Sequence, residues 1–336
     1  MELKQAESAS LKNEATQTAS LMDNSQTALQ LYITAGTSDN TRKAYRSAIR
    51  QFEKWGGRLP TDSSVLVRYL IERAGQLNPR TLALHLTAIS QWHHLQLIPD
   101  PSRTPLVRKT MDGIRRTHGK PKSKAKALRL EHLVSMLSTL HALPDGNKKA
   151  RDRALLLVGF FGAFRRSELV AITVEDLSWE QEGVLISLPK SKTDQELAGL
   201  TRALPYGNES ICPVKALRDW LNRAGITQGA VFKPVNRWDQ IQDKSLSPGA
   251  INGFLKDLGD KCLFDFVPEL SSHSFRRGLS TSAARERVDF ALIKKQGGWK
   301  SDGTVRGYIE EGQQFTENAS LTLMDKMAVL WHQHGK

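Results

Sequence analysis

The stretch at residues 119–127, GKPKSKAKA, limits what this chain can fold into more than any other part of the sequence. Apart from Pro121 it has no apolar side chain larger than alanine, so it has little to bury in a core. Its lysines repel one another, which favours an extended segment; they are Lys120, Lys122, Lys124 and Lys126. A chain of 336 residues is also too long for one ordinary domain. The sequence therefore predicts two domains joined by a basic linker at 119–127.

The chain before the linker is expected to be helical. Residues 1–25 are polar and slightly acidic, and they predict a disordered or loosely helical lead-in. From 26 to 118, apolar residues recur at intervals of three and four, and no strand pattern interrupts them. Helix starts are expected at capping residues, namely Ser38 or Asp39, Thr61 or Asp62, and Asn78. Residues 26–118 are therefore predicted to form a small domain of four or five helices.

The chain after the linker, 128–336, is predicted to be mainly helical with one small sheet. Val184, Ile186 and Leu188 alternate along a predicted strand, residues 189–199 form a turn, and residues 200–204 return as a second strand. A short amphipathic helix is expected from about residue 320, and it is more apolar than a lone surface helix needs. The predicted fold class is mainly α, with a helical first domain and an α+β second domain that carries a β-hairpin.

The charge balance favours a polyanionic partner. The chain has 48 Lys and Arg against 35 Asp and Glu, which gives a formal net charge of +13. Nucleic acid is the first expected partner, and an anionic membrane surface is the second. The two cysteines form neither a disulfide framework nor a metal motif, so a reducing compartment is expected. No apolar run approaches the length of a membrane span, and the N-terminus has no apolar core of a signal peptide.

The segment from 272 to 308 brings phosphate-handling side chains into a short span. It holds a His-x-x-Arg pair, His273 and Arg276, then Gly-Gly-Trp ending at Trp299, then Tyr308. Arginine holds a phosphate by bidentate, charge-assisted hydrogen bonds. Histidine can transfer a proton near neutral pH, and tyrosine is a nucleophile once its phenolate is stabilised. The alternatives are that Trp299 serves packing and that Tyr308 lies on a helix surface.

Two groups upstream could complete such a site. Arg165 and Arg166 precede Glu168 at a predicted helix start, where backbone N–H groups can help to hold a phosphate oxygen. A surface salt bridge between Arg165 or Arg166 and Glu168 or Glu175 is the alternative. Lys192, in the predicted hairpin turn, can reach over a groove, and Lys190 lies beside it in the sequence.

Together these groups meet the needs of phosphodiester transesterification. Two arginines neutralise charge on the non-bridging oxygens, and a lysine protonates the leaving sugar oxygen. A histidine assists removal of the proton from the nucleophile, and the tyrosine attacks phosphorus to form a covalent link. The sequence has no Asp and Glu cluster of the kind that binds Mg²⁺ for two-metal chemistry. Neither a metal nor another cofactor is therefore expected.

The order and spacing of these motifs resemble the tyrosine recombinases, the phage integrase family, and the Gly-Gly-Trp form is most similar to its Cre-like members. The resemblance covers residues 128–331 closely and the helical first domain more loosely. It implies a role for each matched residue: the catalytic set is Arg165, Lys192, His273, Arg276, Trp299 and the nucleophile Tyr308, with Glu168 in support. Arg166 and Arg277 fall on variable positions and are implied to be bystanders. Trp299 replaces a second histidine, and its indole N–H can donate to a phosphate but cannot shuttle a proton.

The resemblance also implies an activity and an assembly. Such an enzyme cleaves and rejoins DNA through a 3′-phosphotyrosine and a Holliday junction, without metal or ATP, in integration, excision or resolution. It acts as a homotetramer on paired inverted sites in double-stranded DNA, and each subunit docks its last helix into a neighbour. A cytoplasmic, nucleoid-associated protein encoded by a bacterium, phage or mobile element is implied.

Basic side chains of the first domain and the linker are expected to contact DNA; they are Arg42, Lys43, Arg46, Arg80, Lys120, Lys122 and Lys124. His85 is placed beside Arg80 on the polar side of one helix, and residues 247–252 are candidates for base contacts from the second domain. A solvated charged face is the alternative for any single helix.

Three other functions remain open. An enzyme related to type IB topoisomerases, or one that makes hairpin telomeres, would use similar groups on one duplex. A DNA-binding regulator with an inactive recombinase fold should have lost at least one of Arg165, Lys192, Arg276 or Tyr308, and none is lost. A basic RNA-binding or membrane-surface protein would explain the charge but not the ordered motifs.

Overall fold

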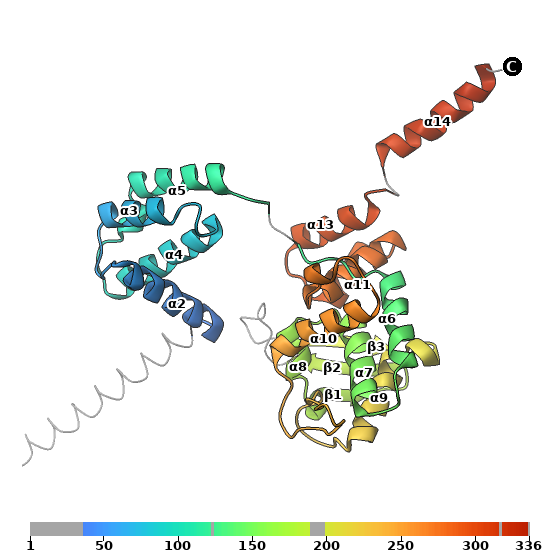
Figure 1. Cartoon of the computed structure of the whole chain (residues 1–336). Coiled ribbons are helices and arrows are strands. Elements are labelled where there is room, and N and C mark those ends of the chain that lie inside the picture. Colours follow the sequence, from blue (N-terminus) through green and yellow to red (C-terminus); the bar gives the residue numbers. More distant parts are fainter. Residues whose placement is uncertain (1–35, 122–123, 189–198, 316–317, 335–336) are drawn as a thin grey trace, which may run out of the picture. The chain divides into compact units, whose positions relative to one another are not determined.

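A computed structural model describes residues 36–121, 124–188, 199–315 and 318–334 of the chain (Figure 1). The chain divides into two compact units, Met1–Lys122 and Ser123–Lys336, and the boundary lies within the basic stretch at 119–127. The lead-in at 1–25, the first expected helix after residue 26 and most of the hairpin turn lie outside the described residues. Mainly helical architecture with one small sheet is confirmed.

The described part of the first unit is built from four α-helices: α2 (Asp39–Trp55), α3 (Ser63–Arg73), α4 (Pro79–Leu95) and α5 (Pro105–His118). The short 3-10 turn η1 (Pro101–Arg103) precedes α5. Side chains of Ser38, Asp62 and Asn78 accept hydrogen bonds from backbone N–H groups in the first turns of α2, α3 and α4. These three caps confirm the predicted helix starts. Phe52, Tyr69, Leu82 and Ile89 are fully buried between the helices and form the core of this unit.

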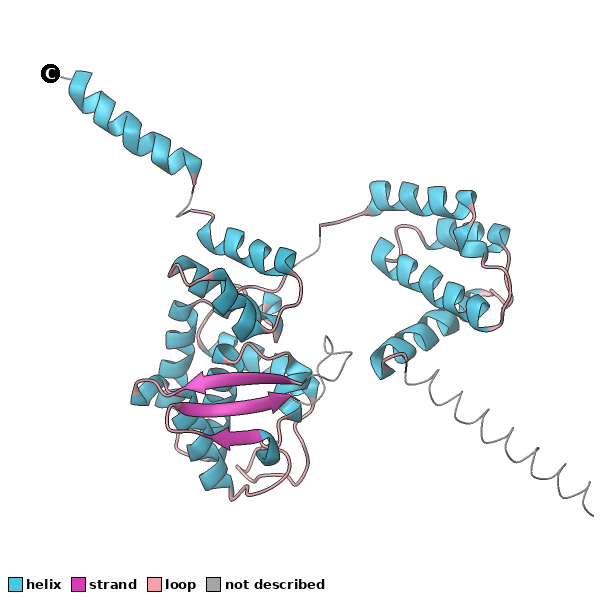
Figure 2. Cartoon of the chain, turned by 180° about the vertical axis from the view of Figure 1, so that it is seen from behind, coloured by secondary structure: helices cyan, strands magenta, loops and turns pink. Residues whose placement is uncertain are grey.

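The second unit contains a three-stranded antiparallel sheet in the order β1 (Leu177–Trp179), β2 (Gly183–Leu188), β3 (Leu200–Pro205). The strands lie side by side in Figure 2, and the helices α7 (Asn147–Phe161) and α9 (Pro213–Ala224) cover one face of the sheet. The predicted hairpin of β2 and β3 is confirmed, with Val184 paired to Leu204 and Ile186 paired to Arg202. The third strand, β1, was not predicted, because three residues are too few to show alternation.

The core of the second unit surrounds α7. From Ala154 to Phe160 every residue of this helix is buried, which is the pattern of a helix enclosed on all sides. Helix α9, α11 (His273–Arg285) and α6 (Leu130–Ala142) pack on it. Helix α10 (Pro248–Lys261) packs on α6 and α8 (Arg166–Ala171), and α12 (Phe290–Gly297) packs on α11. Short 3-10 turns connect these elements at η2 (Val174–Asp176), η3 (Glu209–Ile211) and η4 (Val267–Glu269). This packing holds the ends of α7, α8 and α11 close together.

The last two helices differ in their packing. Helix α13 (Asp302–Gln313) packs on α11, and a Cβ added at Gly312 would lie 2.6 Å from the carbonyl oxygen of Thr281. Such close backbone approach is possible only for glycine. Helix α14 (Ala319–His334) is different, because every residue from 318 to 333 is exposed. Its large apolar side chains face solvent, with exposed fractions of 69% for Leu323, 65% for Met327 and 78% for Trp331. No helix in the described parts of the chain has the length and apolar character needed to cross a membrane.

Candidate active site

The first arginine of the candidate site lies in a sharp turn between α7 and α8. Ala163 adopts a positive φ of 47°, which turns the chain so that Arg165 directly precedes the first residue of α8. The backbone N–H of Arg165 donates to Oε2 of Glu168 at 2.9 Å, and its Nη1 donates to Oε1 of the same carboxylate. The Arg165 side chain is 20% exposed and that of Glu168 is 4% exposed. A phosphate can therefore reach the guanidinium but not the carboxylate that holds it.

The carboxylate of Glu168 stays ionised in this buried place. Burial alone would raise its pKa, but the backbone hydrogen bond from Arg165 and the positive charges of Arg165 and Arg276 outweigh it and lower the pKa below the ordinary value. Arg165 and Glu168 therefore form a partly buried ion pair, not the surface salt bridge that was the alternative to phosphate binding.

The second arginine, Arg276, is buried on α11. Its Nη1 donates to the carbonyl oxygen of Ala163 at 2.5 Å, so it is tied to the same turn that carries Arg165. Burial, and then the positive charge of Arg165, lower the pKa of Arg276 to about 10, while Glu168 opposes this shift. The guanidinium remains charged at neutral pH, since its pKa still lies well above 7. Its carbon lies 4.6 Å from the ring centre of Trp299.

Trp299 joins the arginines to the tyrosine. Helix α12 ends at Gly298, which has a φ of 57°, and this left-handed residue turns the chain so that the indole points inward. The Trp299 side chain is 8% exposed, and its ring centre lies 5.6 Å from that of Tyr308 on α13. Arg276, Trp299 and the half-buried Tyr308 therefore form a continuous contact chain.

Of the other two predicted catalytic residues, the structure describes His273 but not Lys192. His273 is exposed at the first position of α11, one turn before Arg276, and its backbone N–H donates to Oγ of Ser271 at 3.3 Å. Lys192 and its competitor Lys190 lie outside the described residues. The described residues contain no group of three or more His, Cys, Asp or Glu side chains that could hold a metal ion.

Sequence reasoning missed Arg202, a fully buried arginine on β3. Its Nη2 donates to the carbonyl oxygen of Gly297 at 2.8 Å, and its Nη1 donates to that of Lys295 at 3.3 Å. Burial, together with repulsion from Arg165, lowers the pKa of Arg202 to about 10, against the attraction of Glu168. Arg202 thus holds the turn before Trp299 by these two hydrogen bonds. The alternation of a strand could have indicated its burial, because Arg202 lies two residues before the buried Leu204 and therefore on the same inward face of β3.

The residues predicted to contact DNA through the first helices differ in their exposure, and their contact with DNA stays a prediction. Lys43, Arg46 and Arg80 are exposed. Arg42 instead pairs with Asp39 and donates to the carbonyl oxygen of Thr37 at the start of α2. Placing His85 on a polar side was wrong, because it is 2% exposed and its Nδ1 lies 2.6 Å from the hydroxyl of Tyr69. The hydroxyl offers the imidazole a partner in the core, so burial of His85 leaves this nitrogen satisfied.

The candidate contacts in the linker and on α10 have structural partners as well. The carbonyl oxygen of Lys120 accepts a hydrogen bond from Nη2 of Arg80 at 3.1 Å, and Nζ of Lys124 lies 3.9 Å from Oε2 of Glu311. Lys122 lies outside the described residues. Within 247–252, Oδ1 of Asn252 accepts the backbone N–H of Ser272 at 2.9 Å. That asparagine fixes the entry to α11, so its oxygen is engaged within the protein.

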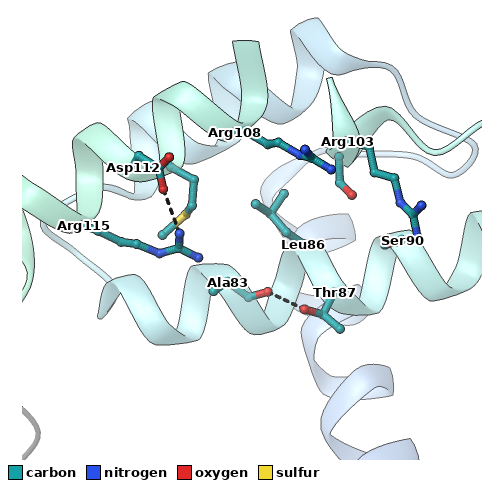
Figure 3. Close-up of a pocket in the computed structure, with 10 residues that line it drawn as sticks. Ala83, Leu86, Thr87, Ser90, Arg103, Arg108, Asp112 and Arg115 are labelled. Atoms are coloured by element: carbon teal, nitrogen blue, oxygen red, sulfur yellow. Dashed lines mark hydrogen bonds and ion pairs between the residues drawn. The ribbon is translucent and has the colours of Figure 1, made fainter. Parts of the chain in front are cut away.

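A groove of about 460 Å³ lies between α4 and α5 in the first unit (Figure 3). Three arginines line it, which makes it a second place to look for anion binding; they are Arg103, Arg108 and Arg115. However, Nε of Arg103 lies 3.2 Å from Asp100, and Nη1 of Arg115 donates to Asp112 at 2.9 Å. Two of the three charges are therefore matched by carboxylates, and the groove lacks the concentrated positive charge of the site around Arg276.

Comparison with known proteins identifies the family. The model of the phage integrase family matches residues 126–314, more than half of the chain. The chain is also 35% identical over 301 residues to the integrase/recombinase xerD homolog of Selenomonas ruminantium, and the match covers 86% of each chain. The chain belongs to the phage integrase family. It is therefore a tyrosine recombinase, an enzyme that breaks and rejoins DNA.

Other relatives agree with this assignment. The recombinase is 26% identical over 282 residues to tyrosine recombinase XerD of Shewanella oneidensis. Its fold matches the crystal structure of XerH bound to palindromic difH, with a TM-score of 0.59, 17% identity and coverage of 86% of this chain and 79% of that one. A lambda integrase dimer bound to a COC′ core site matches with a TM-score of 0.58, 16% identity and coverage of 83% and 92%. The Cre-like assignment, which rests on Trp299, stays a prediction.

Proposed function

We propose that this protein is a site-specific recombinase that exchanges DNA strands by using Tyr308 as its nucleophile. The observation that supports this is the contact chain in which Arg276 links the Arg165 turn to Trp299 and Trp299 meets Tyr308. These contacts support the proposal that Arg165, Arg276, Trp299 and Tyr308 act on one phosphate group. All four are members of the set that the family resemblance implies.

In the proposed reaction the phenol oxygen of Tyr308 attacks the scissile phosphorus. A bond forms between that oxygen and phosphorus, and the bond from phosphorus to the 5′-oxygen breaks. The 3′-phosphate stays on Tyr308, and the 5′-oxygen leaves as a hydroxyl after taking up a proton. The 5′-hydroxyl of a second duplex then attacks the phosphotyrosine and restores the phosphodiester, so the energy of the broken bond is conserved.

Each supporting residue has a proposed part in this step. Arg165 and Arg276 bind the non-bridging oxygens, where charge grows in the transition state. Glu168 keeps Arg165 in position, as its two hydrogen bonds to that residue suggest. His273 takes the proton of the phenol, and Lys192 gives one to the leaving 5′-oxygen.

Strand exchange requires more than one subunit, and α14 is the proposed connector. Its apolar side chains are exposed on a helix of 16 residues, and such a surface costs free energy in water until a partner covers it. Docking of α14 onto the next subunit would generate a head-to-tail ring. We propose a homotetramer on two DNA sites, with a Holliday junction between the two rounds of exchange. A cytoplasmic, nucleoid-associated location follows from this function.

Formation of a covalent adduct tests the nucleophile directly. A cognate duplex is first selected by binding from a random pool, and a nick is placed beside the scissile position so that the cleaved fragment diffuses away. Denaturing gels should then show a protein–DNA adduct with the wild type and none with Tyr308→Phe, while both proteins bind the duplex equally well. An adduct that persists in Tyr308→Phe would overturn the assignment.

A second arm separates strand exchange from topoisomerase-like action on one duplex. Removal of residues from 318 onward deletes α14 and leaves the catalytic residues in place. The shortened protein should still form the adduct on a nicked site but should not join two duplexes. Unchanged joining of two duplexes by the shortened protein would contradict the role proposed for α14.

A further inference from the structure

We infer that Arg277 and Glu311 are positioning residues that hold the nucleophile helix, α13, on its own catalytic domain. The inference rests on the function proposed above, because it treats Tyr308 as the nucleophile. It concerns two residues outside the catalytic set, one of which the family resemblance implies to be a bystander.

The two residues form a partly buried ion pair between helices. Nη2 of Arg277, on α11, donates to both carboxylate oxygens of Glu311, on α13, at 2.5 Å for Oε2. The Arg277 side chain is 10% exposed and that of Glu311 is 30% exposed. Nε of Arg277 is buried and has no hydrogen-bond partner among the described residues. Both hydrogen bonds that Nη2 of Arg277 donates therefore go to one carboxylate.

The pair lies next to the nucleophile. Glu311 follows Tyr308 by three residues on α13, so both side chains project from the same side of the helix. The guanidinium carbon of Arg277 lies 5.9 Å from the centre of the Tyr308 ring. A shift of α13 that separates Arg277 from Glu311 would therefore also move the Tyr308 ring.

Arg276 and Arg277 are consecutive on α11, and they are directed to the proposed phosphate site and to the helix of Tyr308, respectively. Arg276 points to the turn at Ala163 and to Trp299, where the phosphate is proposed to bind. Arg277 points to α13, because neighbouring residues on an α-helix project about 100° apart. One rigid helix therefore sets the distance between the phosphate and the tyrosine oxygen. Removal of Arg277 should disturb that distance without disturbing Arg276.

A second basic residue lies near Glu311 but does not replace Arg277. Nζ of Lys124 is 3.9 Å from Oε2 of Glu311, too long for a hydrogen bond, and its side chain is 63% exposed. Such an exposed pair contributes little. The backbone N–H groups of Lys126 and Leu128 donate to the carbonyl oxygens of Glu269 and Ser274, which fixes this part of the chain on the catalytic domain. Loss of Lys124 should therefore have a much smaller effect than loss of Arg277.

The first measurement is the rate of adduct formation on the nicked duplex. Arg277→Ala and Glu311→Gln should each slow it by about 10- to 100-fold, as expected when a nucleophile is displaced by roughly 1 Å. The double variant with Arg277→Glu and Glu311→Arg should recover part of the rate, since the ion pair is re-formed in reverse. Arg285→Ala is the matched control, because Arg285 on the same helix pairs at 3.9 Å with Glu131 on α6 instead of α13. Rates of the single variants equal to wild type would overturn the inference.

A second measurement separates positioning of Tyr308 from damage to the phosphate site. In a Tyr308→Phe background, hydrogen peroxide supplies a small external nucleophile; its oxygen attacks phosphorus, the bond to the 5′-oxygen breaks, and the 5′-oxygen takes up a proton. Adding Arg277→Ala to this background should leave peroxide-supported cleavage unchanged. An equal loss in both assays would assign Arg277 to the phosphate or to the fold and would overturn the inference.

Hydrogen exchange of the free protein gives a readout that needs no activity. Amides of α13 should exchange faster in Arg277→Ala than in wild type, whereas those of α6 should not, and Arg285→Ala should leave α13 unchanged. If wild type formed no adduct but this difference in exchange were present, the proposed function would fail while the helix contact stood. Unchanged exchange in α13 would count against the contact itself.

Discussion

The guanidinium carbon of Arg276 lies over the ring of Trp299, 4.6 Å from the ring centre, and Arg276 also donates to the carbonyl oxygen of Ala163. One side of the charge is therefore covered by an aromatic ring and another is held by a backbone acceptor. A cation over an aromatic face is stabilised by the ring electrons, more so when water is excluded. The guanidinium is thus held in place by contacts within the protein itself.

The first prediction concerns Arg276. Arg276→Ala should lower the rate of adduct formation by about 10²- to 10³-fold, the loss found when one donor to a developing oxyanion is removed. A methylphosphonate at the scissile position replaces a charged oxygen by a methyl group, so less positive charge is needed. The variant should therefore cleave the methylphosphonate duplex faster than the normal one.

Affinity for the duplex is the control measurement for that experiment. Arg276→Ala and wild type should retain similar affinity for the duplex, because most of the affinity comes from many phosphate contacts spread along the site. Equal loss of rate on both substrates would show that Arg276 acts through the fold instead of through the charge of the phosphate.

The second prediction compares two glycines with the same backbone geometry. Gly298 and Gly225 end α12 and α9 with φ values of 57° and 61°. A Cβ at Gly298 would lie 2.3 Å from Nη2 of Arg202, whereas a Cβ at Gly225 has nothing within 4 Å. Both alanine variants incur a left-handed backbone cost of about 1 kcal/mol. Only Gly298→Ala should also displace Arg202 and slow cleavage.

Thermal melting and adduct formation measure these two effects side by side. Gly225→Ala should lower the melting temperature and keep the wild-type cleavage rate. Gly298→Ala should lower the melting temperature further and reduce cleavage. Wild-type cleavage by Gly298→Ala would mean that support of the Trp299 turn by Arg202 does not matter for the reaction.

The third prediction is a pH dependence of stability at Glu168. Its pKa in the folded state is lowered from the ordinary value of 4.5 by Arg165 and Arg276, despite burial. The ionised carboxylate therefore stabilises the folded protein fully at pH values above that ordinary pKa. The contribution is lost as the pH falls through the folded-state pKa. Glu168→Gln should therefore lower the free energy of unfolding near pH 7 by about 3 kcal/mol, as expected for breaking a buried ion pair.

The difference between Glu168→Gln and wild type should shrink as the pH falls below the pKa of the folded-state carboxyl. Unfolding by urea at a series of pH values measures it, and the second unit is followed by its own tryptophan signal, such as that of the buried Trp220. A difference that stays constant down to low pH would mean that the charge of Glu168 is not what stabilises the turn.

The fourth prediction decides between the two lysines of the hairpin turn. If Lys192 donates a proton to the leaving oxygen, Lys192→Ala should cleave an ordinary duplex slowly. A 5′-bridging phosphorothiolate leaves as a thiolate and needs no proton, so it should restore the rate. Lys190→Ala is the matched control and should cleave both duplexes at the wild-type rate. If the phosphorothiolate restored the cleavage rate of Lys190→Ala and not that of Lys192→Ala, Lys190 would be the proton donor instead.

Local signals predicted much of the fold but little of how the site is supported. Side-chain caps at Ser38, Asp62 and Asn78 act within a few residues, so their helix starts were visible in the sequence. The contacts of Arg202 and Arg277 were not visible, because their partners Gly297 and Glu311 are 95 and 34 residues away. Both arginines look like ordinary charged residues until the folded chain brings the carboxylate or carbonyl to them.

The motif residues were predictable for the opposite reason. Arg165, Arg276, Trp299 and Tyr308 belong to short patterns whose order along the chain carries the information, so no knowledge of contacts was needed. His85 shows the limit of such patterns. His85 was placed with Arg80 on the polar side of its helix, but Tyr69 offers it a hydrogen bond inside the core.

Three guanidinium groups, those of Arg165, Arg202 and Arg276, influence one another around a single carboxylate, that of Glu168. The folded protein thus holds unbalanced positive charge in its interior, and an entering phosphate would remove that imbalance. Stability and activity are consequently opposed at this place. A search for heat-resistant variants should repeatedly recover neutral, well-packed side chains at Arg276, and each such variant should melt at a higher temperature and recombine much more slowly.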